Sequence, residues 1–370
     1  MAINRRSFIA SLTALGFSGL LPARAFGGSG RGYLSTGFDT LSRQHMVSRL
    51  GADFGLVWDL PLPARGHAAT VRPGGTEGLV VARRPGSFAI VFDLADGRQR
   101  HHLKPRPGRH FYGHGIYSAD GNILWMTENA YDSGTGLIGV YDAANGYAPL
   151  AAFPSGGIGP HQLAMMSDGK TLVVANGGIR THPDSGRRKL NLATMQPSLS
   201  YIDAASGRIL EQVTFTDPAD HQLSIRHLAT LPDGGVAFAC QDQGKGTRPS
   251  ALVYTHHMGT GQAFTSLDIP ETDTMRMQGY CGSVTYDRVG KVLAVSSPRG
   301  GLVEFWRMPE GRWLGRFSLK DGCGVAGAAD QAGFVLSSGE GLLIETAAGR
   351  RAIHQQRHPF RQWDNHLTGI

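Results

Sequence analysis

The chain has 370 residues, of which 41% are hydrophobic, 18% are charged and 52 are glycine. This composition excludes a disordered or collagen-like chain, and the length allows a large buried core. The formal charge of +7 falls to +4 without the three arginines of the first 25 residues, which is too weak and too scattered to indicate nucleic-acid binding. Few charges and many glycines favour tight turns between short strands, so we expect an all-β fold.

The N-terminus carries a candidate export signal. Two arginines, Arg5 and Arg6, precede an apolar run over 8–21, and Ala23-Arg24-Ala25 has the small residues of a cleavage site. This arrangement resembles a twin-arginine signal. A transmembrane anchor is the alternative, but it needs roughly 20 apolar residues, and this run is shorter and interrupted by Ser, Thr and Gly. We therefore predict a signal peptide over 1–25, a periplasmic location and no stable membrane insertion.

Two short patterns recur along the rest of the chain. One is an apolar strand, a turn and a second apolar strand, as in 114–126, 161–176 and 227–238. The other is a strand that ends near an acidic residue, a glycine turn and an outer strand, as in 91–97 and 140–146. Together the two patterns describe a four-stranded antiparallel sheet.

The spacing of these units indicates a β-propeller. Successive units start 47, 47, 66, 54 and 42 residues apart, which is the range of propeller blades, whereas a β-sandwich would not repeat so regularly. The starts lie near His67, His114, His161, His227, Cys281 and Cys323.

A seventh blade is assembled from both ends of the chain. Residues 33–63 provide three strands without a first one, and 364–370 match the opening of the other units and then stop. We therefore predict one domain over 26–370, a seven-bladed β-propeller closed by the C-terminal strand, in which 365–370 pair with 33–37. Closure of this kind removes a free sheet edge.

Every blade carries a histidine or cysteine at one equivalent position, six or seven residues before the first turn where that turn is present. The first strand of a propeller blade is innermost, so these side chains are expected to form a ring around the axis. Imidazole and thiolate suit copper, iron or zinc and exclude calcium and magnesium, which prefer oxygen. We predict copper or iron as the cofactor, with zinc as a third candidate. The predicted ligands are His67, His114, His161, His227, Cys281, Cys323 and His366.

Two readings of this ring stay open. In a structural ring the histidines would be hydrogen-bonding struts, as in WD-type propellers, although a WD-type histidine stands farther from its turn. In a metal ring seven groups exceed the coordination of one ion, so some would lie outside the first coordination sphere or several ions would bind. The metal reading also accounts for unpaired thiols in an oxidising compartment, because metal would protect Cys281 and Cys323. Cys240, on a second strand, is expected to be a buried apolar residue.

Two long polar loops are expected at the mouth of the channel, over 177–191 and 241–248. Propellers commonly place substrate or partner contacts in such loops, and a solvated insertion is the alternative. The candidate contact residues are Arg180, His182, Asp184, Lys189 and Asn191. The sequence contains no nucleophile elbow, phosphate-binding glycine loop or haem attachment motif.

The run 177–191 and its continuation over 195–199, together with the N-terminal arginines and the Asp364-Asn365-His366 ending, resemble the family of exported proteins called DUF1513. The repeat at 159–176 also looks like that of YVTN and lactonase-type propellers. The DUF1513 resemblance implies a seven-bladed periplasmic propeller encoded beside imelysin-like and dihaem peroxidase-like proteins, and hence iron or copper handling with such partners.

The function that follows is metal delivery, storage or redox handling by a protein that we expect to be a monomer. A lactonase-like hydrolase is one alternative, but its hard ion would require carboxylates, which the ring lacks. A metal-free interaction scaffold is the other. Because imidazole and thiolate bind metal only when deprotonated, loading is expected to release protons and to weaken as the pH falls through about 6.5.

Overall fold

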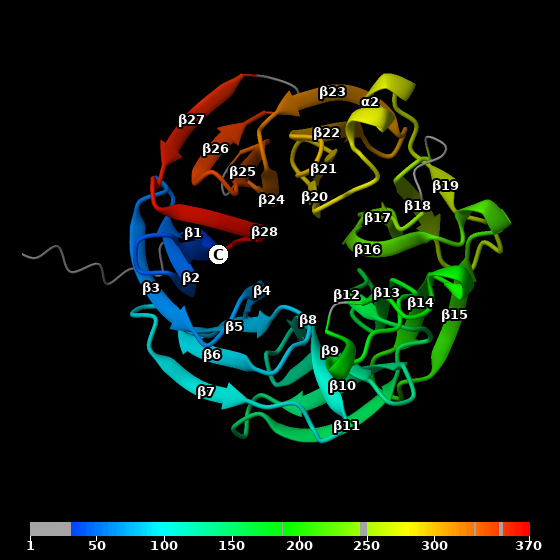
Figure 1. Cartoon of the computed structure of the whole chain (residues 1–370), viewed down its shortest axis with the longest axis horizontal. Helices are drawn as coiled ribbons and strands as arrows, with labels where there is room; N and C mark the ends of the chain where they lie inside the picture. The colour runs from blue at the N-terminus through cyan, green and yellow to red at the C-terminus, as the bar shows by residue number, and fades with distance from the viewer. Residues whose placement is uncertain (1–30, 187, 245–249, 329–330, 348–350) are drawn as a thin grey trace, which may run out of the picture. The chain divides into compact units, whose positions relative to one another are not determined.

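The structure is a computed structural model that describes residues 31–186, 188–244, 250–328, 331–347 and 351–370. In this part of the chain the strands form seven four-stranded antiparallel sheets around one axis (Figure 1). The predicted all-β, seven-bladed propeller is therefore confirmed. The predicted signal over 1–25 lies outside the described residues. Among those residues, no helix is both long and apolar enough to span a bilayer.

The blades are numbered in chain order, and each is given from its innermost to its outermost strand. Blade 1 contains β28 (Arg361–Gly369), β1 (Gly32–Asp39), β2 (Gln44–Gly51) and β3 (Leu56–Leu62). Blade 2 contains β4 (Gly66–Val71), β5 (Glu77–Ala82), β6 (Ala89–Asp93) and β7 (Gln99–Leu103). Blade 3 contains β8 (Arg109–Tyr117), β9 (Ile123–Ala130), β10 (Thr135–Asp142) and β11 (Ala148–Pro154). Blade 4 contains β12 (Pro160–Met165), β13 (Thr171–Asn176), β14 (Ser198–Asp203) and β15 (Ile209–Thr214).

The remaining three blades have the same strand order. Blade 5 contains β16 (Leu223–Thr230), β17 (Gly235–Asp242), β18 (Val253–His257) and β19 (Thr265–Ser266). Blade 6 contains β20 (Ser283–Asp287), β21 (Val292–Ser297), β22 (Leu302–Arg307) and β23 (Arg312–Ser318). Blade 7 contains β24 (Gly322–Gly327), β25 (Phe334–Ser338), β26 (Leu342–Thr346) and β27 (Ala352–Arg357). The short helices are η1 (Pro183–Ser185), η2 (Leu192–Thr194), η3 (Pro218–Asp220) and α2 (Glu271–Arg276).

The ring is closed by the C-terminal strand, as predicted. β28 runs antiparallel to β1, with Tyr33 opposite Gly369, Leu34 opposite Thr368 and Gly37 opposite Trp363. Beyond the strand, the backbones of Gly32 and Ile370 exchange two hydrogen bonds of 3.1 and 2.9 Å. The C-terminus consequently lies beside β1 near the centre of the ring (Figure 1).

The core lies between neighbouring blades, where middle strands are covered on both faces. All six residues of β13 are buried, whereas the outermost strand β15 is partly or fully exposed along its length. Packing on both faces requires near-continuous apolar runs, and these runs produced the repeat in the sequence. Cys240 on β17 belongs to one such core and is 0% exposed, so its predicted apolar role is confirmed.

Removal of residues 365–370 is expected to lower solubility and thermal stability sharply. The truncation leaves the inner edge of β1 without its partner strand, and free edges promote association between chains. Size-exclusion chromatography and thermal melting of the truncated and full-length chains test this expectation. A truncated chain that stays monomeric and melts at the full-length temperature would contradict closure by β28.

Candidate metal centre

Five histidines from five innermost strands meet at the axis. We call them the five-histidine cluster: His67 on β4, His114 on β8, His161 on β12, His227 on β16 and His366 on β28. The innermost strands contact one another in sequence around the axis, so equivalent positions on separate blades come together there. The convergence that the sequence predicted for these five residues is present in the structure.

Irregularities in the β-ladders accompany these histidines. The pairing of β12 with β13 shifts around His161, and that of β8 with β9 shifts between Phe111 and Gly115, around His114. On β16 the extra residue is Arg226, directly before His227. A bulge turns a side chain away from the regular alternation of a strand, and here it allows long side chains to face the axis.

Hydroxyl groups on neighbouring strands hold the backbone at these irregular positions. Thr36 donates to the carbonyl of His67 at 3.2 Å, Ser35 to that of His366 at 3.0 Å, and Thr127 to that of His114 at 3.2 Å. These carbonyls therefore have partners despite the interrupted ladders, which fixes the position from which each imidazole projects.

Close packing of the rings leaves no room for larger groups nearby. Gly113 has φ of 113°, and a Cβ at this position would lie 2.4 Å from Cδ2 of His67. A residue with a side chain is therefore excluded by both conformation and contact with the cluster.

The ring geometry fits a single metal ion. One nitrogen from each of His67, His114, His161 and His366 lies within 4.8 Å of the others. The Nε2 atoms of His67 and His161 are 3.3 Å apart. A tetrahedral ion with metal–nitrogen distances of about 2.0–2.1 Å has nitrogen–nitrogen edges of about 3.3–3.4 Å, so this pair already has the required separation. The ring of His227 is 4.9 Å from those of His161 and His366, measured between centroids.

The ring nitrogens are buried, and several lack partners. Nδ1 of His67 and Nε2 of His114, His227 and His366 are buried without any hydrogen-bond partner among the described residues. Leaving such a group unpaired costs roughly 1–3 kcal/mol, so native structures rarely keep several of them together without a ligand. A ring of structural struts would have satisfied these atoms instead.

The same burial keeps the cluster neutral. Desolvation lowers the pKa of His67, His114, His161 and His227 well below the usual value, and neighbouring imidazoles lower it further. For His366, burial lowers the pKa to about 4. A neutral imidazole is the form that binds metal, so the cluster is ready for coordination at neutral pH.

Gln162 fixes the tautomer of His227. Its side-chain Nε2 donates to the carbonyl of Leu228 at 3.1 Å, so its Oε1 faces Nδ1 of His227 at 3.2 Å. Because Oε1 can only accept, the proton of the neutral ring lies on Nδ1, and the unpartnered Nε2 carries a free lone pair. Residues that orient a ligand in this way are a regular part of metal sites.

Replacing Gln162 with Leu is expected to weaken metal binding by about 10- to 100-fold, the usual effect of losing such a positioning group. The protein should stay folded, because leucine fills a similar volume. Gln162→Glu retains an acceptor for Nδ1–H and should keep more of the affinity than Gln162→Leu. Metal titration of the three proteins checks this order, and equal affinities would contradict a positioning role.

The two predicted cysteine ligands do not join the cluster. Cys323 packs with Tyr33, Trp363 and Leu367, and its thiol donates to the Trp363 carbonyl at 3.3 Å. Cys281 lies in the core of blades 4 to 6 and is 0% exposed. Cys281 precedes β20, so it does not lie on an innermost strand as the sequence predicted, and in the core both thiols pack as small apolar groups. Burial raises the pKa of both thiols, to about 12 for Cys323, which disfavours the thiolate that a metal would need.

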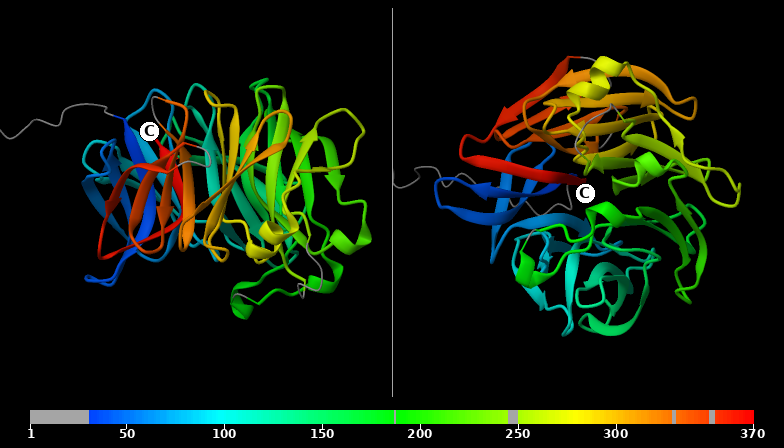
Figure 2. Two further views of the ribbon diagram at one scale, coloured as in Figure 1. Left: turned by 90° about the horizontal axis from the view of Figure 1, so that it is seen from above. Right: turned by 45° about the vertical axis from the view of Figure 1, so that its right-hand side comes forward.

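The predicted contact loop between β13 and β14 is present, and it projects from one face of the ring (Figure 2). Its polar groups bind one another and residues of neighbouring blades, Asp132 between β9 and β10 and Gln243 after β17. Asn191 accepts from the Arg180 backbone at 2.7 Å, Arg180 donates to the Asp132 carbonyl at 2.7 Å, and His182 contacts Asp132 and Asp184. Of the five predicted loop residues, only Lys189 lines the cavity described next.

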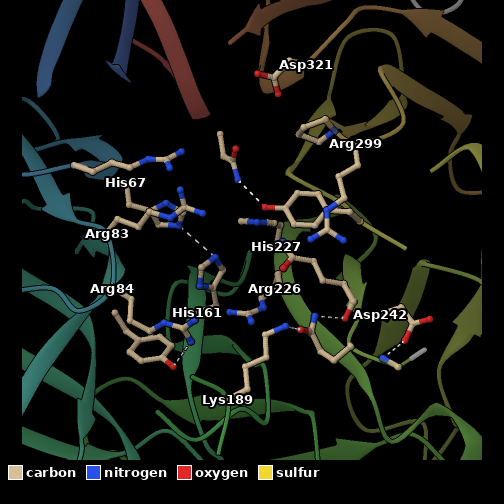
Figure 3. A pocket seen from close by; sticks show the side chains of 18 residues that line it. His67, Arg83, Arg84, His161, Lys189, Arg226, His227, Asp242, Arg299 and Asp321 are labelled. Atoms are coloured by element: carbon tan, nitrogen blue, oxygen red, sulfur yellow. Dashed lines mark hydrogen bonds between the residues drawn. The ribbon is translucent and has the colours of Figure 1, made fainter. Parts of the chain in front are cut away.

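A cavity of about 590 Å³ opens onto the cluster (Figure 3). Its wall includes three of the five histidines, His67, His161 and His227. The end of β17 and the start of the loop after it also border the cavity, through residues 241–244. Six further lining residues carry positive charge: Arg65, Arg83, Arg84, Lys189, Arg226 and Arg299.

Arg226 is a buried cation of this wall that the sequence did not single out. It is 7% exposed, and burial beside Arg84 lowers its pKa to about 10, so it stays protonated at neutral pH. The only signal in the sequence is that Arg226 stands directly before His227 on an inner strand. In a regular strand adjacent side chains point to opposite faces, so Arg226 would be expected to point away from the axis.

Comparison with known proteins identifies the family. The chain matches the family described as "Protein of unknown function (DUF1513)" over residues 60–370. The chain belongs to this family. No curated protein is similar enough to count as a match. Among solved structures, one described as Kuenenia stuttgartiensis Hydrazine Synthase is similar, with a TM-score of 0.60 and 17% identity over 80% of this chain and 88% of that chain. At this identity the likeness shows the propeller fold alone.

Proposed function

We propose that this DUF1513 propeller is a periplasmic metalloprotein that binds a copper or iron ion through histidines at its axis and serves in metal handling or redox with partner proteins. Zinc also suits an all-nitrogen site. The observation that carries the proposal is the group of four mutually close histidine nitrogens, beside a fifth ring whose Nε2 is unpartnered. His67, His114, His161 and His366 would hold the ion, with His227 as a further ligand.

The chemistry of the ligand set supports a transition metal. The cluster consists of imidazoles alone, which suit copper, zinc and iron and not calcium or magnesium. Coordination would also give partners to buried nitrogens that otherwise have none. The two cysteines are no longer needed as ligands, because their burial in blade cores accounts for them as apolar residues.

The location and partners of the protein are proposed from its sequence. A twin-arginine signal exports folded proteins, and a common reason for this route is a cofactor inserted before export. Imelysin-like and dihaem peroxidase-like proteins are the proposed partners, in keeping with the family resemblance. The charge and lining of the cavity that opens onto the histidines would select what reaches the ion.

Elemental analysis of protein exported through its own N-terminal segment tests the proposal. We expect about one equivalent of copper or iron, and X-ray absorption should report nitrogen ligands without sulfur. Metal-free protein should gain thermal stability on addition of Cu²⁺, Fe²⁺ or Zn²⁺, because a ligand that binds only the folded state stabilises it. Protein with only trace metal and no thermal shift with any of the three ions would instead indicate a structural ring.

A further inference from the structure

Arg226 is a buried cation without a compensating anion. It is 7% exposed, its Nε has no hydrogen-bond partner, and no carboxylate of the described residues forms an ion pair with it. Burying an unpaired charge is costly, and proteins generally pair such a group or use it to bind a ligand. Its guanidinium faces the cavity above the histidines (Figure 3).

Two more arginines of the wall, Arg84 and Arg299, form no ion pair with a carboxylate of the described residues. Arg84 donates to the hydroxyl of Tyr112 at 2.9 Å and lies over its ring. Arg299 lies over the ring of Tyr280, with its central carbon 4.6 Å from the ring centre. Stacking on an aromatic ring orients a guanidinium and leaves its edge N–H groups available to a ligand.

Only part of the positive charge in the wall is neutralised locally. Arg65 is paired with the buried Asp364, partly through a 2.9 Å hydrogen bond. The carboxylates that line the cavity are Asp242 and Asp321, against six cationic side chains. Asp242 also accepts from the backbone of Gly244 at 2.7 Å. The neutral histidines add no negative charge, so Arg226, Arg84 and Arg299 give the wall a positive excess.

We infer that this cavity binds a small anion carrying carboxylate or phosphate groups, with Arg226 at its base and Arg84 and Arg299 as further contacts. Guanidinium groups bind both kinds of group through paired N–H···O hydrogen bonds, and a cavity of this size suits a small molecule. Such an anion would supply the charge that Arg226 lacks.

The position of Arg226 also affects the binding of a metal ion by the histidine cluster. Arg226 directly precedes His227, and both residues line the cavity together with His161. Positive charge beside the cluster opposes entry of a bare cation. An anion in the cavity would cancel this repulsion, so we expect metal and anion to bind with positive coupling. Anion binding does not require the metal, although bound metal would strengthen it to the same degree.

Isothermal titration of the purified protein, made metal-free on a chelating resin, tests the inference. Citrate and inorganic phosphate are the two probes, and glycerol is the uncharged control. A soluble chelator is avoided because it is itself a polyanion. We expect binding of citrate or phosphate that weakens as NaCl is raised, because surface charges are screened by salt. Binding of citrate alone identifies carboxylates as the ligand class, and binding of phosphate alone identifies phosphates.

The variants are Arg226→Gln and Arg84→Gln, with Arg208→Gln as the matched control. Arg208 is exposed in the β14–β15 turn, away from the cavity lining, and its replacement removes the same charge. We expect at least a tenfold loss of anion affinity in the first two variants and none in the control. Without anion, Arg226→Gln should melt at the same or a higher temperature than the unaltered protein, because an uncompensated buried charge is removed. A purely structural Arg226 would instead give a lower melting temperature.

The inference is overturned if neither probe binds the unaltered protein at millimolar concentration and low salt, or if all three variants bind equally. Elemental analysis after metal loading, made before any citrate is added because citrate binds copper and iron, separates the two proposals. Anion binding in a protein that takes up no metal would contradict the metal function and leave the anion site standing. Metal uptake without anion binding would contradict the anion site and leave the metal function standing.

Discussion

Replacing both His67 and His161 with Asn is expected to reduce metal affinity by at least about a thousandfold. Their Nε2 atoms, 3.3 Å apart, are the pair that already has the edge length of a tetrahedral site. Loss of a group that merely orients a ligand costs about 10- to 100-fold, so loss of two direct ligands should cost far more. Metal content after purification and titration of metal-free protein measure the effect.

His110 provides a matched control for this double variant. It lies on β8, is 4% exposed, has two unpartnered ring nitrogens, and burial lowers its pKa to about 4. It stacks against Tyr112 and is not part of the metal-ligand group. His110→Asn should therefore retain metal, whatever its effect on stability. If His110→Asn loses metal as completely as the double variant, then burial of imidazole in general, and not the cluster, controls metal content.

The blades could be predicted from the sequence because every blade needs the same pattern of apolar strands and turns. Middle strands that are covered on both faces must be apolar, and turns between them must contain Asp or Gly, so spacing alone located the inner strands. Equivalence between blades then placed five histidines at the axis. The ladder irregularities, which allow His114 and His161 to face inward, leave no comparable signal in the sequence.

Equivalence failed for Cys281 because this residue lies before β20 and not on it, and for Cys323 because a shared backbone position does not fix where a side chain points. At Cys323 the ladder is also irregular, but the thiol meets the Trp363 carbonyl of the next blade instead of the axis. The roles of Gln162 and Arg226 were missed for another reason. Both stand next to ring histidines, yet the groups that determine their roles come from other blades and are distant in sequence: the carbonyl of Leu228 for Gln162 and the charge of Arg84 for Arg226.

Acid should destabilise the metal-free protein steeply as the pH falls below about 6.5. Unfolded histidine has a pKa near 6.5, and burial lowers the pKa of the five cluster residues in the folded state, so the unfolded state binds more protons. The stabilisation is therefore fully present above pH 6.5 and is lost as the pH falls towards the folded pKa, which is about 4 for His366. Each histidine that stays neutral contributes a slope of roughly 1.4 kcal/mol per pH unit.

Urea unfolding at several pH values between 7.5 and 5 measures this loss. Domain stabilities are only about 5–15 kcal/mol, so several such histidines should unfold the metal-free protein within one or two pH units. Carboxylates such as Asp39 and Asp93, whose pKa is lowered by hydrogen bonds, lose their contribution only in stronger acid. Glu304, whose pKa is raised to about 7 by burial, acts in the opposite direction and offsets the slope of about one histidine. The His67→Asn, His161→Asn double variant should show a shallower slope, and an unchanged slope would contradict the assignment to the cluster.

Bound metal should make the protein less sensitive to acid. Because the rings are already neutral at pH 7, loading is expected to release few protons there, which calorimetry in buffers of different ionisation enthalpy can measure. Protons compete weakly for bases of lowered pKa, so metal should stay bound below the pH of about 6.5 at which unperturbed histidines would release it. The sequence alone placed this loss at about 6.5, and burial of the rings moves the expectation to lower pH. Release of nearly one proton per histidine at pH 7 would mean that the rings are charged in the metal-free protein, and therefore that the cluster opens to water before metal enters.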